Sequence, residues 1–153
     1  MPSPYDNNVT SSPMSSNYAL SERVERLVPY NHISYALYLF SYFTAGLTWI
    51  IPIVMNYIKR DEVRGTWLYS HFDWQIKTFW YSIVFFVIGA IMLVMGYGSA
   101  ILGFGTSGGA SSVGWGGSLI GTLGLVVMVF TTLWHLYRIV RGWIALAQHK
   151  AVP

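Results

Sequence analysis

The sequence contains no cysteine and few charged residues. Its 153 residues are 10% charged, against about a quarter in ordinary soluble domains. Without cysteine there can be no disulfide, thiolate metal ligand or cysteine nucleophile. The nine lysines and arginines form no dense block, which argues against nucleic-acid binding. The chain is instead rich in apolar residues. Of its residues, 54% are hydrophobic and 17% aromatic, a composition typical of membrane proteins.

Two long stretches carry no charge. One is the 32 positions between Arg26 and Lys59, and the other is the 60 positions between Lys77 and Arg138. Because about 20 apolar residues cross a bilayer as a helix, the first stretch has room for one crossing and the second for two plus a turn. We predict an all-α membrane protein with three transmembrane helices, at about residues 33–58, 79–97 and 119–137, within one domain over residues 20–147.

The segments around these crossings are short. Residues 1–19 are rich in Ser, Asn and Pro and are predicted to be a disordered tail rather than a signal peptide. In residues 20–28, apolar positions recur at helical spacing opposite charged ones, which predicts a short interfacial helix before Pro29; a solvated helical turn fits equally well. Residues 96–118 hold nine of the fifteen glycines and are predicted to form a loop. Residues 148–153 are predicted to be a C-terminal tail.

Several residues are expected to shape the helices. Pro52 is predicted to bend the first crossing, because proline lacks an amide hydrogen. Gly65 is placed as a helix stop, and residues 70–73 have the form of a capping box that starts the next helix. Gly117 and Gly121 form a G-x-x-x-G that allows close helix approach, either between the second and third crossings or between copies of the chain.

Tyrosines give the first crossing a polar face. Tyr35, Tyr38 and Tyr42 recur there at helical spacing, with Ser and Thr between them. Hydroxyl groups in hydrocarbon seek partners on other helices. We therefore expect this face to pack inside a helix bundle or against a partner, and the alternative is a wet path through an oligomer.

The histidines and terminal arginines are the candidates for ligand binding. His71 and His135 are predicted near the same end of consecutive helices, so a haem held by both is a weak candidate; no pattern indicates a metal site. His135, Arg138 and Arg141 recur where the last helix leaves the bilayer. They are candidates to bind a lipid headgroup, and the simpler interpretation is that the arginines anchor the helix.

Basic residues predict the orientation. Three crossings would place seven of the nine on one side and two on the other. The positive-inside rule then puts the N-terminus outside and the C-terminus in the cytoplasm of a bacterial inner membrane.

Short motifs spread over residues 30–143 resemble a known family. They are His32-Ile33-Ser34-Tyr35, Ile51-Pro52, Lys59-Arg60-Asp61-Glu62, Trp74-Gln75-Ile76 and Tyr137-Arg138-Ile139-Val140-Arg141-Gly142. With them the chain resembles small bacterial membrane proteins of unknown function, related to the MamF-type magnetosome proteins and distantly to the membrane component of the chloroplast Tic import machinery. The resemblance implies a membrane location and no established reaction.

The sequence shows no catalytic triad, phosphate-binding loop or carboxylate pair, and no cofactor is expected. An ion-coupled transporter normally keeps an ionisable residue within its span, and none lies in the predicted crossings before Arg138. We expect a non-enzymatic accessory or scaffold subunit that contacts membrane lipids and either other membrane subunits or its own copies. The alternatives are a small oligomeric channel or translocation component and, more distantly, a haem-binding membrane protein.

Overall fold

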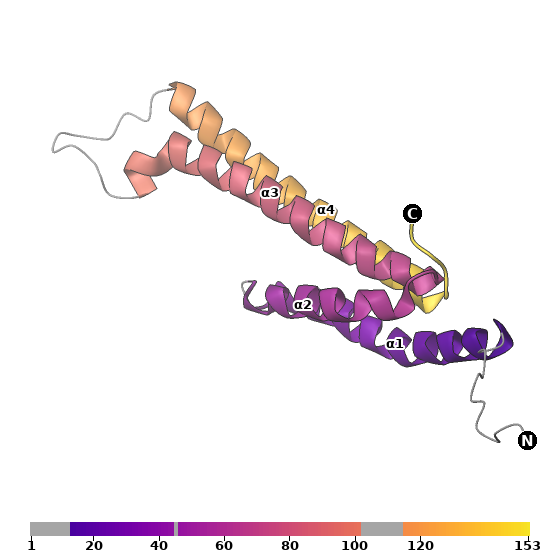
Figure 1. The fold of residues 1–153 in the computed structure, drawn as a ribbon. Coiled ribbons are helices and arrows are strands. Elements are labelled where there is room, and N and C mark those ends of the chain that lie inside the picture. Colours follow the sequence, from indigo (N-terminus) through magenta and orange to yellow (C-terminus); the bar gives the residue numbers. More distant parts are fainter. Residues whose placement is uncertain (1–12, 45, 102–114) are drawn as a thin grey trace, which may run out of the picture. The chain divides into compact units, whose positions relative to one another are not determined.

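The computed structural model describes residues 13–44, 46–101 and 115–153. Over these residues the chain forms four α-helices and two short 3-10 helices, and no strand (Figure 1). The elements are α1 (Pro13–Ser41), η1 (Leu47–Trp49), α2 (Ile50–Lys59), η2 (Arg60–Val63), α3 (Trp67–Ile101) and α4 (Trp115–Ala147). The prediction of an all-α fold is therefore confirmed.

The chain divides into two compact units. The first contains Met1–Trp74 with Trp143–Pro153, and the second contains Gln75–Gly142. The first unit thus holds α1, α2, the first two turns of α3, the last turn of α4 and the C-terminal residues. The second unit is made of the long remaining parts of α3 and α4.

In the first unit, α1 and α2 form an antiparallel hairpin (Figure 1). Tyr30 donates a hydrogen bond to the carbonyl of Met55, and Arg26 lies 3.9 Å from Glu62. The chain reverses at Gly46, whose φ of 86° lies in the left-handed region that glycine adopts without strain. The amide of Gly46 donates to the carbonyl of Ser41 at 2.8 Å and so ties the turn to the end of α1.

The hairpin corrects the prediction of one helix over residues 33–58. That segment is broken by the turn after Ser41 and begins again as α2 at Ile50. The break comes from Gly46 and not from Pro52, which lies in the first turn of α2. Amides in the first turn have no intrahelical acceptor, so a proline there removes no hydrogen bond and bends nothing.

α1 is also longer than predicted. It begins at Pro13, so residues 13–19, expected in the tail, are helical, and the helix of residues 20–28 continues through Pro29 to Ser41. Pro29 leaves the carbonyl of Glu25 without its usual donor. Continuation past this point is supported by a buried stripe on α1 that spans the proline and includes Leu27, Asn31 and Tyr35.

The start of α3 differs from the expected capping box. Gly65 has a φ of 85°, as a helix stop requires, but α3 then begins at Trp67. Residues 70–73 therefore lie inside the helix. The hydroxyl of Ser70 donates to the carbonyl of Trp67 at 2.7 Å instead of capping an amide, because that carbonyl lies one turn earlier on the same helix.

In the second unit, α3 and α4 run side by side and antiparallel (Figure 1). Glycines set their close approach. Gly96 lies against the backbone of Gly117 and Gly121, and Gly89 lies against that of Gly124. Of the predicted glycine loop, Gly96 and Gly117 thus belong to helices, while residues 102–114 lie outside the described part of the chain.

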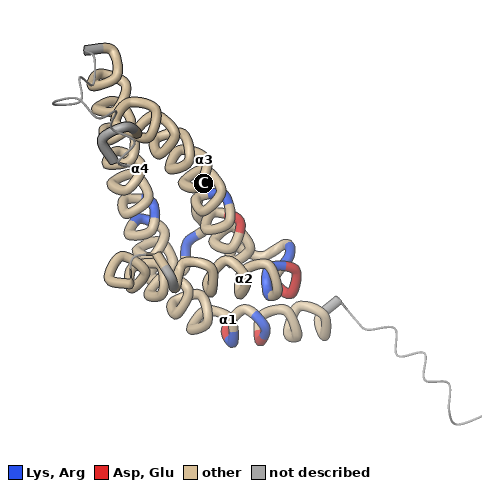
Figure 2. Tube along the Cα trace, turned by 90° about the vertical axis from the view of Figure 1, so that its left-hand side faces the viewer, with Lys and Arg blue, Asp and Glu red and all other residues tan. Residues whose placement is uncertain are grey.

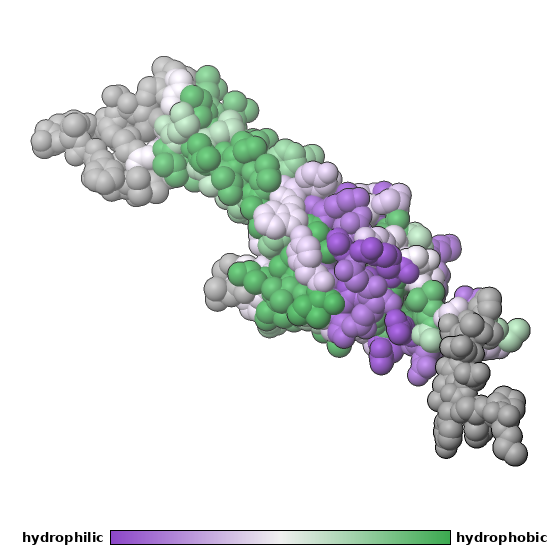
Figure 3. All heavy atoms as spheres, in the orientation of Figure 1, coloured by the Kyte–Doolittle hydropathy of each residue, from purple (hydrophilic) through white to green (hydrophobic). Residues whose placement is uncertain are grey.

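Within the described residues, two helices are long and apolar enough to cross a membrane, Trp67–Gly98 and Gly116–Ala147. They contain the predicted crossings at 79–97 and 119–137. Figure 2 shows the charged residues on α1, around η2 and near the α3 start and α4 end, with none along the rest of α3 and α4. On the face seen in Figure 3, hydrophobic residues cover these uncharged parts.

Candidate functional site

His71 is the centre of a buried polar cluster in the first unit. Its Nε2 lies 2.8 Å from the carbonyl oxygen of Lys150, and its Nδ1 lies 3.1 Å from the hydroxyl of Tyr35. A carbonyl can only accept, so Nε2 carries the proton and Nδ1 accepts from Tyr35. His71 and Tyr35 are fully buried. The Trp67 ring packs edge-on against the imidazole, with 5.7 Å between the two ring centroids.

This cluster holds the C-terminal residues in place. Beside the bond from His71 to Lys150, the amide of Val152 donates to the hydroxyl of Ser70 at 3.0 Å, and the Val152 side chain is buried. His149 makes this turn with a φ of 53°, an uncommon conformation for a residue with a side chain. The segment predicted as a C-terminal tail is therefore docked on the first turns of α3.

A second histidine connects distant parts of the same unit. The indole nitrogen of Trp143 donates to Nδ1 of His32 at 2.8 Å. This hydrogen bond joins α1 to the end of α4 across 111 positions of sequence. Because the indole N–H can only donate, Nδ1 of His32 is the acceptor, and the ring proton of the neutral imidazole is on Nε2.

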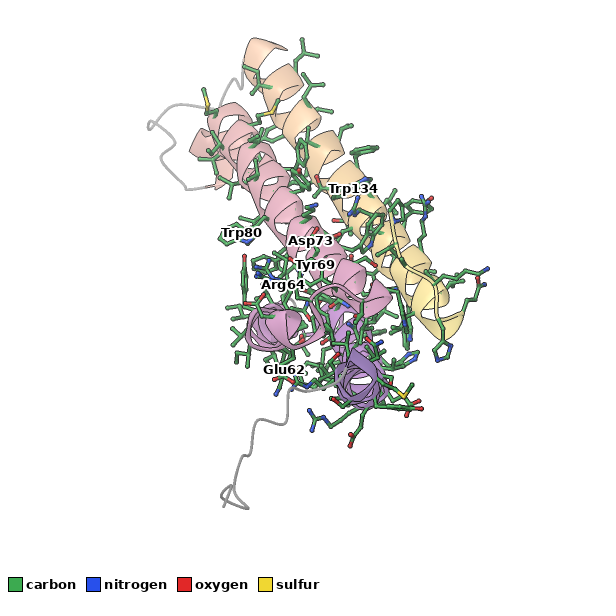
Figure 4. All side chains as sticks on the ribbon, turned by 45° about the vertical axis from the view of Figure 1, so that its right-hand side comes forward. Glu62, Arg64, Tyr69, Asp73, Trp80 and Trp134 are labelled. Carbon is green, nitrogen blue, oxygen red and sulfur yellow. The ribbon has the colours of Figure 1, made fainter. Side chains whose placement is uncertain are left out.

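The second unit contains a separate pair of polar contacts between α3 and α4. Nδ1 of His135 lies 2.7 Å from the hydroxyl of Ser82, and both side chains are buried. One turn later on α4, Nε of Arg138 donates to Thr78 at 2.7 Å, and its guanidinium lies 5.0 Å from the centre of the Trp134 ring (Figure 4).

These contacts divide the predicted headgroup cluster. His135 faces α3 and is buried, so it is not available to a headgroup. Arg138 is bonded to Thr78 and is half-buried, whereas Arg141 is exposed and donates to the hydroxyl of Tyr137 at 3.3 Å. Only the two arginines remain candidates for contact with lipid.

The arrangement gives no support to a haem between His71 and His135. Both ring nitrogens of His71 are hydrogen-bonded to protein, and Nδ1 of His135 is bonded to Ser82. The two residues belong to different units, and each is held by partners in its own unit. Over the described parts of the chain, no group of three or more His, Asp or Glu residues could hold a metal ion.

The tyrosines of the predicted polar face have different environments. Tyr35 and Tyr38 are buried, as is Ser34 beside them. Tyr42 lies in the turn after α1 and is 41% exposed. Tyr42 therefore departs from the expected packed face, because the helix that should carry it inward ends at Ser41.

An open groove of about 590 Å³ lies beside the His71 cluster in the first unit. Its walls include Leu20, Val24 and Val28 of α1, together with Trp67 and His149. The spacing of residues 20–28 correctly marks an apolar face. The spacing did not predict the groove, because its opposite wall comes from segments more than 35 positions away in the sequence.

Comparisons of the chain with protein-family models, with curated proteins and with solved structures found no match. The resemblance to MamF-type proteins therefore stays a prediction.

Proposed function

We propose that the protein is a non-enzymatic accessory subunit of the bacterial inner membrane, in which α3 and α4 cross the bilayer and bind other membrane proteins through their exposed sides. The observation that carries this proposal is exposure. In each helix, only 22% of the most apolar 18-residue stretch is buried within the protein. In a soluble protein such helices would be core elements and mostly covered, so the exposed remainder calls for lipid or protein around it.

The charge distribution supports two crossings rather than three. Lys77 and the five basic residues before it precede the uncharged part of α3, and Arg138, Arg141 and Lys150 follow that of α4. Two crossings put all nine on one side, whereas three would divide them seven to two. By the positive-inside rule, both termini then face the cytoplasm and the glycine-rich segment faces outward.

The hairpin of α1 and α2 argues against the third crossing. α2 has ten residues, which make a helix of about 15 Å, half of the ~30 Å hydrocarbon thickness. The channel alternative relied on the tyrosine face of this segment. Tyr35 and Tyr38 are buried inside the first unit, so their burial gives the channel alternative no support and we do not propose it.

The absence of cysteine makes the topology directly testable. We expect Ser107→Cys to react with a membrane-impermeant maleimide added outside intact cells. Ser3→Cys and Gln148→Cys should react only after the membrane is opened. Labelling of Ser3→Cys from outside would show three crossings and contradict the two-crossing topology.

Binding to other membrane proteins is tested by photo-crosslinking in living cells. Phe130 is 67% exposed on α4, and its neighbour Thr131 is buried. A photoreactive amino acid at position 130 should give a small number of discrete protein adducts. The same group at 131 is the matched control and should crosslink only within the chain. If position 130 gives lipid adducts alone, the accessory-subunit proposal is wrong while the topology is unaffected.

A further inference from the structure

The α1–α2 hairpin has an apolar tip that the described residues of its own unit leave exposed. We define the hairpin tip as Phe40, Phe43, Ile50, Ile51 and Val54. Phe43 is 86% exposed, Ile50 64%, and the other three about half. On α2 the exposed side continues through Tyr57 and Ile58 at helical spacing, while Ile53 and Asn56 on the opposite side are buried. The hairpin therefore has one face packed and one face bare.

Several backbone amides of the turn at the tip are hydrogen-bonded within the turn. The amides of Tyr42, Phe43 and Thr44 donate to carbonyls three residues earlier, at 3.0–3.2 Å, and Gly46 and Trp49 also donate within the turn. The hydroxyl of Ser41 donates to the carbonyl of Tyr38, and those of Thr44 and Thr48 lie 2.9 Å apart. Each backbone group that is bonded within the turn lowers the cost of moving the turn from water into hydrocarbon, where an unsatisfied polar group costs several kcal/mol.

The other end of the hairpin is strongly charged. We call it the hairpin base, and it contains Glu22, Arg23, Glu25, Arg26, Lys59, Arg60, Asp61, Glu62 and Arg64. Lys59 lies 2.6 Å from Glu62, and Arg64 lies 3.0 Å from Asp61 (Figure 4). The hydrogen bond from Lys59 lowers the pKa of Glu62, so this carboxylate stays ionised at neutral pH. Such a base cannot follow the tip into hydrocarbon.

From these observations we propose that the α1–α2 hairpin is a wedge that inserts its tip into one leaflet of the bilayer and keeps its base among the headgroups. α2 carries tip residues at its start and Lys59 of the base at its end, and its ten residues span about 15 Å, which is the depth of one leaflet. Three residues, 64–66, join η2 to the apolar helix α3. This short link joins the base directly to the first turns of α3, which belong to the same unit.

The lipid partner follows from the charges of the base. Five basic residues stand beside four acidic ones, and several of them are paired, so the base has little net charge. Zwitterionic headgroups match such a surface, whereas a cluster of basic residues alone would call for anionic lipid. The wedge is therefore expected to insert into phosphatidylcholine membranes. This inference goes beyond the proposed accessory function, because it concerns α1 and α2 and needs no protein partner.

Spin labels on single cysteines measure the depth directly, using the full chain in phosphatidylcholine nanodiscs. Phe43→Cys and Val54→Cys report on the tip, Arg23→Cys on the base, and Phe130→Cys on the α4 span. The ratio of oxygen to nickel-chelate accessibility should be several-fold higher at 43 and 54 than at 23, and close to the value at 130. The value at 43 should not change when anionic lipid is added.

Three results would overturn the wedge. If the label at position 43 is as accessible to the nickel chelate as the label at position 23, the tip lies in water and is either solvated or a binding site for a protein. If 43 becomes deep only with anionic lipid, the proposed headgroup match is wrong. If a cysteine at 43 reacts with an impermeant maleimide from outside cells, the hairpin crosses the whole bilayer. Position 130 separates these failures from failure of the proposed function, because a buried 130 with a wet 43 leaves the α3–α4 spans intact.

Discussion

Replacing Gly96 by alanine is expected to destabilise the α3–α4 hairpin by about 1–3 kcal/mol, the usual cost of forcing extra atoms into a packed contact. A Cβ at this position would meet the backbone of Gly117 and Gly121, which cannot rotate away as a side chain could. The helices would have to move apart. Unfolding of the purified protein in mild detergent, followed by tryptophan fluorescence during heating or SDS titration, measures the loss.

Gly98 provides the matched control two residues further along α3. A Cβ there would lie 3.5 Å from one methyl of Val94, an ordinary contact. Alanine has the higher helix propensity, so Gly98→Ala should be neutral or slightly stabilising. Equal destabilisation by both substitutions would mean that the Gly96 contact does not hold the helices together. Leucine at 96 should be more harmful than alanine.

The helices that could cross a membrane were predictable, because their signal is local. A stretch of about 20 apolar residues without charge marks a helix long enough to cross a bilayer, and this pattern lies within one segment of the sequence. The hairpin was mispredicted for a reason that is also local. Pro52 was the expected break, but a proline in the first turn of a helix disrupts no hydrogen bond. Gly46 instead stands where glycine commonly follows the end of a helix. Reading Gly46 as a helix stop would have divided the segment.

The polar cluster was only partly predictable. His71 could be singled out as a rare ionisable residue near an apolar run. Its partners, Tyr35 and the carbonyl of Lys150, lie 36 and 79 positions away. No periodicity within one helix carries information about such pairs. A backbone carbonyl leaves no trace in the amino-acid pattern at all, so the docking of the C-terminal residues required the tertiary structure.

Replacing His71 by leucine is expected to have the largest effect of any single change in the first unit. It removes the hydrogen bonds that the imidazole makes with the buried hydroxyl of Tyr35 and with the carbonyl of Lys150, and a lost buried hydrogen bond costs about 1–3 kcal/mol. Leucine is close to histidine in size, so the loss reports mainly on hydrogen bonding. The unfolding measurement used for Gly96 gives the size of the effect.

Tyr35→Phe isolates one half of the same cluster. It removes the bond to Nδ1 of His71 but leaves Nε2 free to donate to Lys150, so it should cost about half as much as His71→Leu. The two variants should also differ in the C-terminal residues, which only His71→Leu releases. Carboxypeptidase digestion of the folded protein should therefore be faster for His71→Leu and unchanged for Tyr35→Phe. If digestion accelerates equally in both, Tyr35 is required to orient the imidazole, and the bond to Lys150 does not act independently of it.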